Sequence, residues 1–138
     1  MKTITAILLA LACIFCLAAC APKNDGGDLW ADAKYTKDTE LGEGATKVVV
    51  EVKAGDKSVT FTVNTDETTV GAALMEHGLI EGDEGDYGLY VKKVNGILAD
   101  YDVDQTYWAF YINGEYAMTG VDVTDIAEGD TYILERTK

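Results

Sequence analysis

The sequence has little of the chemistry on which most enzymes depend. It contains one histidine, one proline and three cysteines, and all three cysteines lie within the first 20 positions. From Ala21 onward there is therefore no disulfide, no thiol nucleophile and no thiolate metal site. A lone histidine, His77, offers neither a catalytic triad nor a zinc site. We therefore expect a protein that is not an enzyme and has no catalytic residue, metal ligand or cofactor.

Basic residues are also scarce. The chain has 11 Lys and Arg against 24 Asp and Glu, which gives a formal net charge of −13. Such a charge repels phosphate backbones, so nucleic-acid binding is excluded. We interpret the acidity as a solvated surface that keeps the protein soluble, with attraction of a cation or basic partner as the alternative.

The N-terminus carries an export pattern. Lys2 is followed by the apolar run 4–15, which is too short to span a membrane, and then by Leu-Ala-Ala-Cys at 17–20. These four residues resemble the bacterial lipobox, in which the cysteine is lipidated. We predict a lipoprotein signal peptide at 1–19, lipid attachment at Cys20 and a place on the extracytoplasmic face of the cell membrane. A plain secretory signal is the alternative.

Residues 20–45 lack sustained periodicity and are rich in Asp, Gly, Lys and Thr, as expected of a flexible tether. Leu29, Trp30 and Tyr35 are unusual in a tether, because exposed linkers rarely retain large apolar side chains. The alternative that these three residues dock onto the folded domain therefore stays open.

Residues 46–138 have the pattern of a single α+β domain of β-grasp character, with a mixed sheet and one packed helix. Alternation places Val48, Val50 and Val52 inward on the first strand. Thr68 is the expected cap of the helix, Gly78 its end, and His77 lies where the helix dipole favours a cationic ring. The expected elements are strands at 46–53 and 58–64, a helix at 69–77, a polar loop at 81–88, and strands at 87–95 and 131–136.

Three aspartates, Asp100, Asp102 and Asp104, begin like a Ca²⁺-binding loop. An EF-hand would need Gly at the sixth position and Glu at the twelfth, where this chain has Gln105 and Tyr111. We therefore expect a solvated strand edge, whose like charges discourage edge-to-edge pairing, with an adventitious Ca²⁺ site as the alternative.

The stretch Tyr107–Tyr116, YWAFYINGEY, predicts a hairpin that turns at Asn113-Gly114, because a two-residue turn needs positive φ at both central positions. Alternation places Trp108 and Phe110 on a core face and Tyr107 and Tyr111 on the other. Several tyrosines on one face suit a flat ligand with polar edges or a partner surface.

The run GLYVKKVNG, the following YWAFYINGEY with its closing EGD turn, and the helix sequence TVGAALMEHGL are similar to the transcobalamin-like C-terminal domain of exported bacterial lipoproteins. The resemblance covers Thr46 to Lys138. It implies a binding protein for cobalamin or a related corrinoid, acting in capture or uptake as one jaw of a clamp whose helical partner domain this sequence lacks. The alternative function is a protein-interaction or adhesion module of the cell envelope. The resemblance and the pattern together assign the ligand-binding residues as Tyr90, Asn95, Tyr107, Trp108, Tyr111, Asn113 and Gly114.

Overall fold

Strands make up about half of the structure, a computed structural model that describes residues 29–86 and 88–138. The predicted signal peptide, Cys20 and Tyr87 lie outside the described residues. The elements are η2 (Leu29–Asp32), β1 (Thr39–Leu41), β2 (Thr46–Ala54), β3 (Lys57–Thr65), α2 (Val70–Glu76), β4 (Ile80–Gly85), β5 (Gly88–Val94), β6 (Ile97–Leu98), α3 (Tyr101–Asp104), β7 (Tyr107–Ile112), β8 (Glu115–Tyr116), η3 (Val121–Val123) and β9 (Thr131–Thr137).

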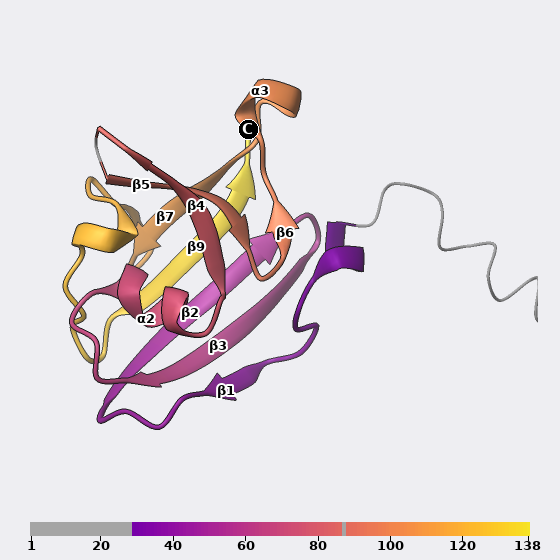
Figure 1. Cartoon of the computed structure of the whole chain (residues 1–138). Helices are drawn as coiled ribbons and strands as arrows, with labels where there is room; N and C mark the ends of the chain where they lie inside the picture. Colours follow the sequence, from indigo (N-terminus) through magenta and orange to yellow (C-terminus); the bar gives the residue numbers. More distant parts are fainter. Residues whose placement is uncertain (1–28, 87) are drawn as a thin grey trace, which may run out of the picture.

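Two sheets and one main helix form the expected α+β fold. The larger sheet has six strands in the order β1-β3-β2-β9-β7-β8, and the smaller has the order β4-β5-β6. β1 is parallel to β3 and β2 is parallel to β9, so the larger sheet is mixed as predicted. Helix α2 and the smaller sheet lie over one face of the larger sheet (Figure 1).

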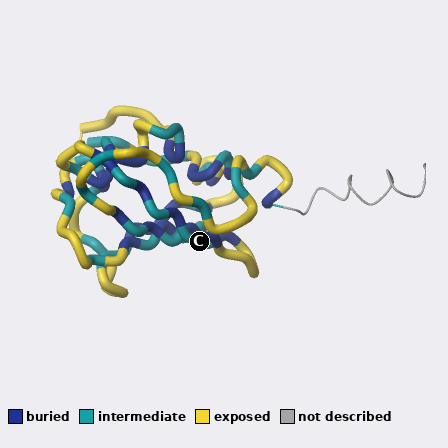
Figure 2. Tube along the Cα trace, turned by 90° about the horizontal axis from the view of Figure 1, so that it is seen from below, coloured by how far each residue is buried: buried dark blue, intermediate teal, exposed yellow. Residues whose placement is uncertain are grey.

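Register explains where the core sits. The antiparallel β2–β3 pair places Val50 opposite Phe61, and the parallel β2–β9 pair places Val50 beside Tyr132. Because side chains alternate across a strand, Val48 and Val52 share the inward face of β2 and are also buried. The buried positions run through the middle of the molecule, with exposed loops around them (Figure 2).

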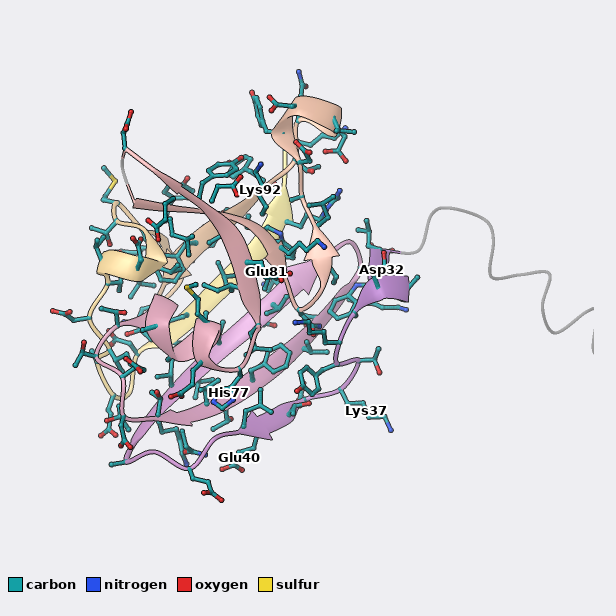
Figure 3. All side chains as sticks on the ribbon, in the orientation of Figure 1. Asp32, Lys37, Glu40, His77, Glu81 and Lys92 are labelled. Atoms are coloured by element: carbon teal, nitrogen blue, oxygen red, sulfur yellow. The ribbon has the colours of Figure 1, made fainter. Side chains whose placement is uncertain are left out.

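Helix α2 is shorter than predicted, and its cap is a different residue. The side chain of Thr69, not Thr68, accepts the hydrogen bond from Ala72 N at 3.2 Å, so the prediction of Thr68 was wrong by one residue. Gly78 follows with φ 65°, as expected at a helix end. His77 is the C-terminal cap and lies near β1 (Figure 3); its Nε2 is 3.4 Å from the Glu76 carboxylate.

The expected polar loop at 81–88 is instead strand β4, which pairs antiparallel with β5. Every β4 residue after Ile80 is exposed, so this edge strand has no buried face to produce an apolar alternation. Strand β5 agrees with the strand predicted at 87–95, and Asn95 and Gly96 turn the chain after it with positive φ at both residues.

Residues 29–45 are built into the domain, which corrects the tether prediction for this segment. Trp30 is only 7% exposed, and its indole N–H donates to Ala54 O at 2.9 Å. Strand β1 extends the larger sheet through pairs such as Glu40 with Thr62. Leu29 and Tyr35 also pack against the core, so the docking alternative is the one that the structure shows.

Within residues 29–86 and 88–138, no helix is long and apolar enough to cross a membrane.

Candidate functional site

Strands β7 and β8 form the predicted hairpin. Asn113 has φ 53° and Gly114 has φ 84°, so both central residues of the turn adopt the positive φ that a tight hairpin requires. The flanking strands pair Tyr111 with Tyr116 and Ile112 with Glu115. The hairpin therefore forms at the expected register.

The two faces of β7 also agree with the prediction. Trp108 and Phe110 are buried, and the Phe110 ring stacks on Tyr132 with centroids 6.0 Å apart. On the opposite face, the Tyr111 ring makes an edge contact with Tyr116 at 5.6 Å. Trp108 thus contributes to the core, whereas Tyr111 belongs to the uncovered side of the sheet.

A break in the register of β5 fixes the position of Trp108. Glu81 pairs with Lys93 and Gly82 with Val91, so Lys92 has no pairing partner on β4. Its carbonyl accepts the Trp108 indole N–H at 3.2 Å and the Ala99 N–H at 2.8 Å. Lys92 is therefore a β-bulge, and its carbonyl links the smaller sheet to the larger one through the hydrogen bond from Trp108.

The side chain of Lys92 forms an ion pair across the smaller sheet. Its ammonium is 2.8 Å from the Asp83 carboxylate. This hydrogen bond and the charge of Asp83 raise the pKa of Lys92 above its ordinary value. Lys92 lies on β5 and Glu81 on the adjacent β4 (Figure 3).

An apolar pocket lies between β5, β7 and the segment around η3. Its volume is about 130 Å³. We call it the seam pocket; its lining residues are Leu89, Tyr90, Val91, Tyr107, Trp108, Phe110, Gly120, Val121 and Leu134. Three of the seven predicted ligand residues, Tyr90, Tyr107 and Trp108, are thus brought together. Tyr90 is 44% exposed and is the most accessible of the three.

The other predicted ligand residues lie elsewhere. Asn95 is 0% exposed: its Oδ1 accepts from Tyr35 N at 2.9 Å and its Nδ2 donates to Tyr35 O at 2.8 Å. Asn113 Nδ2 donates to Asp130 at 3.0 Å, and Asn113 Oδ1 accepts from Thr131 N at 2.9 Å. Both asparagines therefore use their side chains to join distant parts of the chain. Gly114 serves the turn, and Tyr111 does not line the seam pocket.

One residue that sequence reasoning missed supports the edge of the seam pocket. Asp122, in η3, accepts a hydrogen bond from Leu89 N at 3.1 Å. A Cβ at Gly88 would come within 2.8 Å of the same carboxylate, so glycine permits the close approach. No local pattern marks Asp122, because its partner lies 33 positions away.

The three aspartates after β6 form a short helix and not the expected strand edge. Asp100 caps α3 by accepting from Asp102 N at 3.0 Å. Asp104 accepts from the Thr106 hydroxyl and from Arg136 at 3.0 Å. Its hydrogen bonds from Thr106, helped by the Arg136 charge, hold the pKa of Asp104 below its ordinary value. In the part of the chain that the structure describes, no three His, Cys, Asp or Glu side chains gather as a metal site.

Comparison with known proteins shows the family to which the chain belongs. Residues 66–137, just over half of the chain, match the family described as "Domain of unknown function (DUF4430)". The chain belongs to this family. A candidate metal-binding protein from Ruminococcus gnavus ATCC 29149, solved by crystallography, is similar at a TM-score of 0.64 and 31% identity; the likeness covers 67% of this chain and 97% of that one. No curated protein matches the sequence.

The fold also resembles part of haptocorrin, solved in complex with Cbi. The TM-score is 0.54 at 16% identity, over 70% of this chain. The DUF4430 chain spans only 26% of the haptocorrin chain. At this identity the likeness concerns the fold alone, so the family that the chain is shown to belong to is DUF4430.

Proposed function

We propose that this DUF4430 chain is a binding protein for cobalamin or a related corrinoid, held at the extracytoplasmic face of the membrane by a lipid on Cys20, without catalytic activity. The observation that carries the proposal is the seam pocket, which gathers Tyr90, Tyr107 and Trp108 from two sheets. A fold shared with part of haptocorrin, a protein crystallised with Cbi, supports the choice of ligand.

The size of the seam pocket determines what the domain contributes. Sites that enclose a whole small molecule usually measure about 300–1,000 Å³, whereas this pocket measures about 130 Å³. The domain therefore holds one edge of a corrinoid, and the rest of the ligand contacts solvent or a second protein. Because affinity is what remains after the costs of association, we expect weak binding by the isolated chain.

Calorimetric titration of a chain beginning at Ala21 with cyanocobalamin and with cobinamide tests the proposal. We expect heat with at least one of them. Tyr90→Ala should weaken binding about tenfold or more, since an aromatic anchor commonly contributes about 2 kcal/mol. Tyr116→Ala is the matched control, because Tyr116 is also exposed and does not line the seam pocket. Absence of heat with both ligands at millimolar concentration would overturn the proposal.

A second candidate function is protein interaction, and α3 favours it. None of its residues is buried, and Val103 is 80% exposed with Leu98 and Tyr101 also exposed. Arg136 nevertheless fixes the segment by donating to Leu98 O at 2.9 Å and to Asp104. A projection that is fixed in this way and exposes Tyr101 and Val103 between aspartates suits a partner surface. If α3 were the functional element, Val103→Ser would abolish partner binding and leave any corrinoid heat unchanged.

A further inference from the structure

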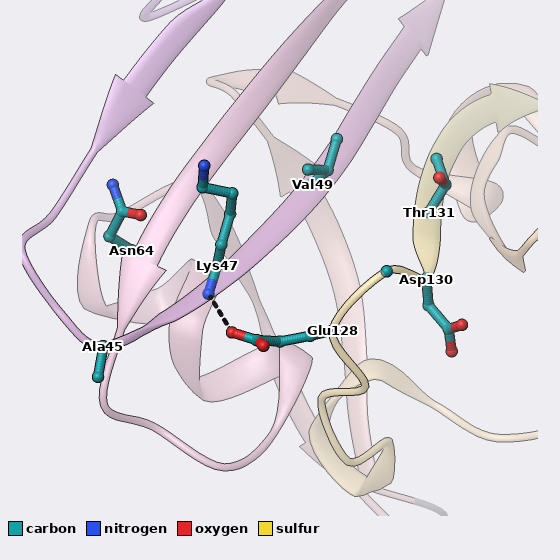
Figure 4. Close-up of a pocket in the computed structure, with 8 residues that line it drawn as sticks. Ala45, Lys47, Val49, Asn64, Glu128, Asp130 and Thr131 are labelled. Atoms are coloured by element: carbon teal, nitrogen blue, oxygen red, sulfur yellow. Dashed lines mark hydrogen bonds between the residues drawn. The ribbon is translucent and has the colours of Figure 1, made fainter.

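A second pocket lies at one end of the uncovered face of the larger sheet (Figure 4). Its volume is about 490 Å³, within the range of about 300–1,000 Å³ that small-molecule sites occupy. We call it the β2–β9 trough; its lining residues are Ala45, Lys47, Val49, Asn64, Glu128, Gly129, Asp130 and Thr131. None of these residues lines the seam pocket.

The sheet supplies the floor of the trough. Val49 and Thr131 are register partners in the parallel β2–β9 pair, so their side chains stand side by side. Lys47, two residues before Val49, points to the same side of β2 and pairs in register with Asn64 of β3. Strand pairing therefore fixes the spacing between the apolar floor and the Lys47 side chain.

The turn before β9 supplies the wall, and hydrogen bonds hold it at both ends. Ile126 N donates to Thr68 O at 2.9 Å, and Ala127 N donates to the hydroxyl of buried Tyr132 at 3.1 Å. The Asn113 amide holds the Asp130 carboxylate at 3.0 Å. A wall fixed in this way needs little rearrangement to receive a ligand.

Charge is divided across the trough. Glu128 accepts a 3.4 Å bond from the main-chain N–H of Lys47, while the Lys47 ammonium points away from that carboxylate (Figure 4). Among the described residues, no carboxylate lies within ion-pair distance of the Lys47 ammonium. One side of the trough thus presents an unpaired cation, and the other presents the Glu128 carboxylate, while the Asp130 carboxylate points away from Lys47 and accepts from Asn113 (Figure 4).

We propose that the β2–β9 trough binds a small zwitterion. Its amine lies against the Glu128 carboxylate, and its carboxylate lies against the Lys47 ammonium. Pairing both charges of the ligand with fixed opposite charges favours a molecule that carries both over one that carries either. The site is separate from the proposed corrinoid site and does not depend on it.

The test is an NMR titration of the chain beginning at Ala21 with γ-aminobutyrate, using butyrate and butylamine as probes with one charge each. We expect the amide resonances of Val49, Gly129 and Thr131 to shift with γ-aminobutyrate at millimolar concentration, and much less with either single-charge probe. Lys47→Gln should weaken the binding about tenfold, as loss of a charged partner does.

Lys53→Gln is the matched control. Lys53 lies on the same strand and the same face, outside the trough, where it pairs with Glu51 at 3.9 Å, so its loss should leave the binding unchanged. The proposal is overturned if γ-aminobutyrate shifts none of these amides, if butyrate or butylamine binds equally well, or if Lys47→Gln and Lys53→Gln have the same effect.

Discussion

The two Asn-Gly turns of this protein have the same sequence and nearly the same backbone conformation, yet their asparagine side chains differ in burial and in hydrogen-bond partners. Asn95 and Asn113 both have φ 53°, and Gly96 and Gly114 follow at 80° and 84°. Asn95 is fully buried and holds the main chain of Tyr35, 60 positions away. Asn113 is exposed and holds Asp130 beside the β2–β9 trough. Turn chemistry therefore sets the local conformation, while the surroundings decide what each side chain does.

The glycines of the two turns differ in the same way. A Cβ at Gly96 would lie 2.4 Å from Asp32 O, whereas a Cβ at Gly114 would meet nothing within 4 Å. The first turn is packed under the N-terminal segment, and the second projects into solvent. Of the two turns, only the one at Asn95-Gly96 is thus covered by the N-terminal segment.

Replacing each asparagine by glycine should give the largest difference in stability between the two turns. Glycine keeps the positive φ, so the change removes only side-chain bonds. Asn95→Gly leaves both main-chain groups of Tyr35 without partners, and we expect it to lower the free energy of unfolding by about 3 kcal/mol. Asn113→Gly, at an exposed site, should cost about 1 kcal/mol or less. Urea unfolding measures both; equal midpoints would show that the N-terminal segment does not depend on Asn95.

Replacing each glycine by alanine gives the next largest difference. Positive φ costs a non-glycine residue about 1 kcal/mol at either position. At Gly96 the added methyl must also displace the main chain of Asp32, so we expect a total of about 2 kcal/mol or more. Thermal unfolding of Gly96→Ala and Gly114→Ala would measure the difference in stability between the two variants. If Gly96→Ala were the more stable of the two, the packing described for the Asn95-Gly96 turn would be contradicted.

Sequence predicted the parts of this fold that depend on local chemistry. The hairpin at Asn113 and the inward alternation of β2 follow from nearby residues, and both are confirmed. Strand β4 could not be predicted, because it buries no alternating apolar residues. The docking of residues 29–45 could not be assigned either, since the Trp30 indole finds its acceptor 24 positions away on Ala54.

The candidate site was predictable only in part, for the same reason. The aromatic residues of β7 are visible in the sequence, but the seam pocket also needs β5 and Gly120. The bulge at Lys92, which gives the Trp108 indole its acceptor, lies opposite the step from Glu81 to Gly82 on β4, a stretch whose sequence predicts a loop and therefore no register. Trp108 is therefore assigned to the core correctly, and its hydrogen bond to Lys92 O comes only from the structure.

Low pH should produce a smaller, local effect: amide exchange in α3, which follows the Asn95-Gly96 turn, should increase more than amide exchange in the hairpin that contains Asn113-Gly114. The segment after Asn95-Gly96 includes α3, whose Asp104 has its pKa lowered by Thr106. A carboxyl with a lowered folded pKa contributes stability that is present above its unfolded pKa of 3.8 and is lost as the pH falls through the lower folded value. Amide exchange in α3 should therefore increase below about pH 4, before exchange in the β7–β8 hairpin. Simultaneous loss of protection in both would contradict the anchoring role of Asp104.

The two tryptophan indoles provide the most direct test of corrinoid binding at the seam pocket. The Trp108 indole donates to Lys92 O at the pocket, while the Trp30 indole donates to Ala54 O and does not line the pocket. Titration with cobinamide or cyanocobalamin, followed through the two indole N–H resonances, should shift Trp108 and leave Trp30 in place. If neither resonance moves at millimolar ligand, or if Trp30 moves and Trp108 does not, the seam pocket is not the corrinoid site.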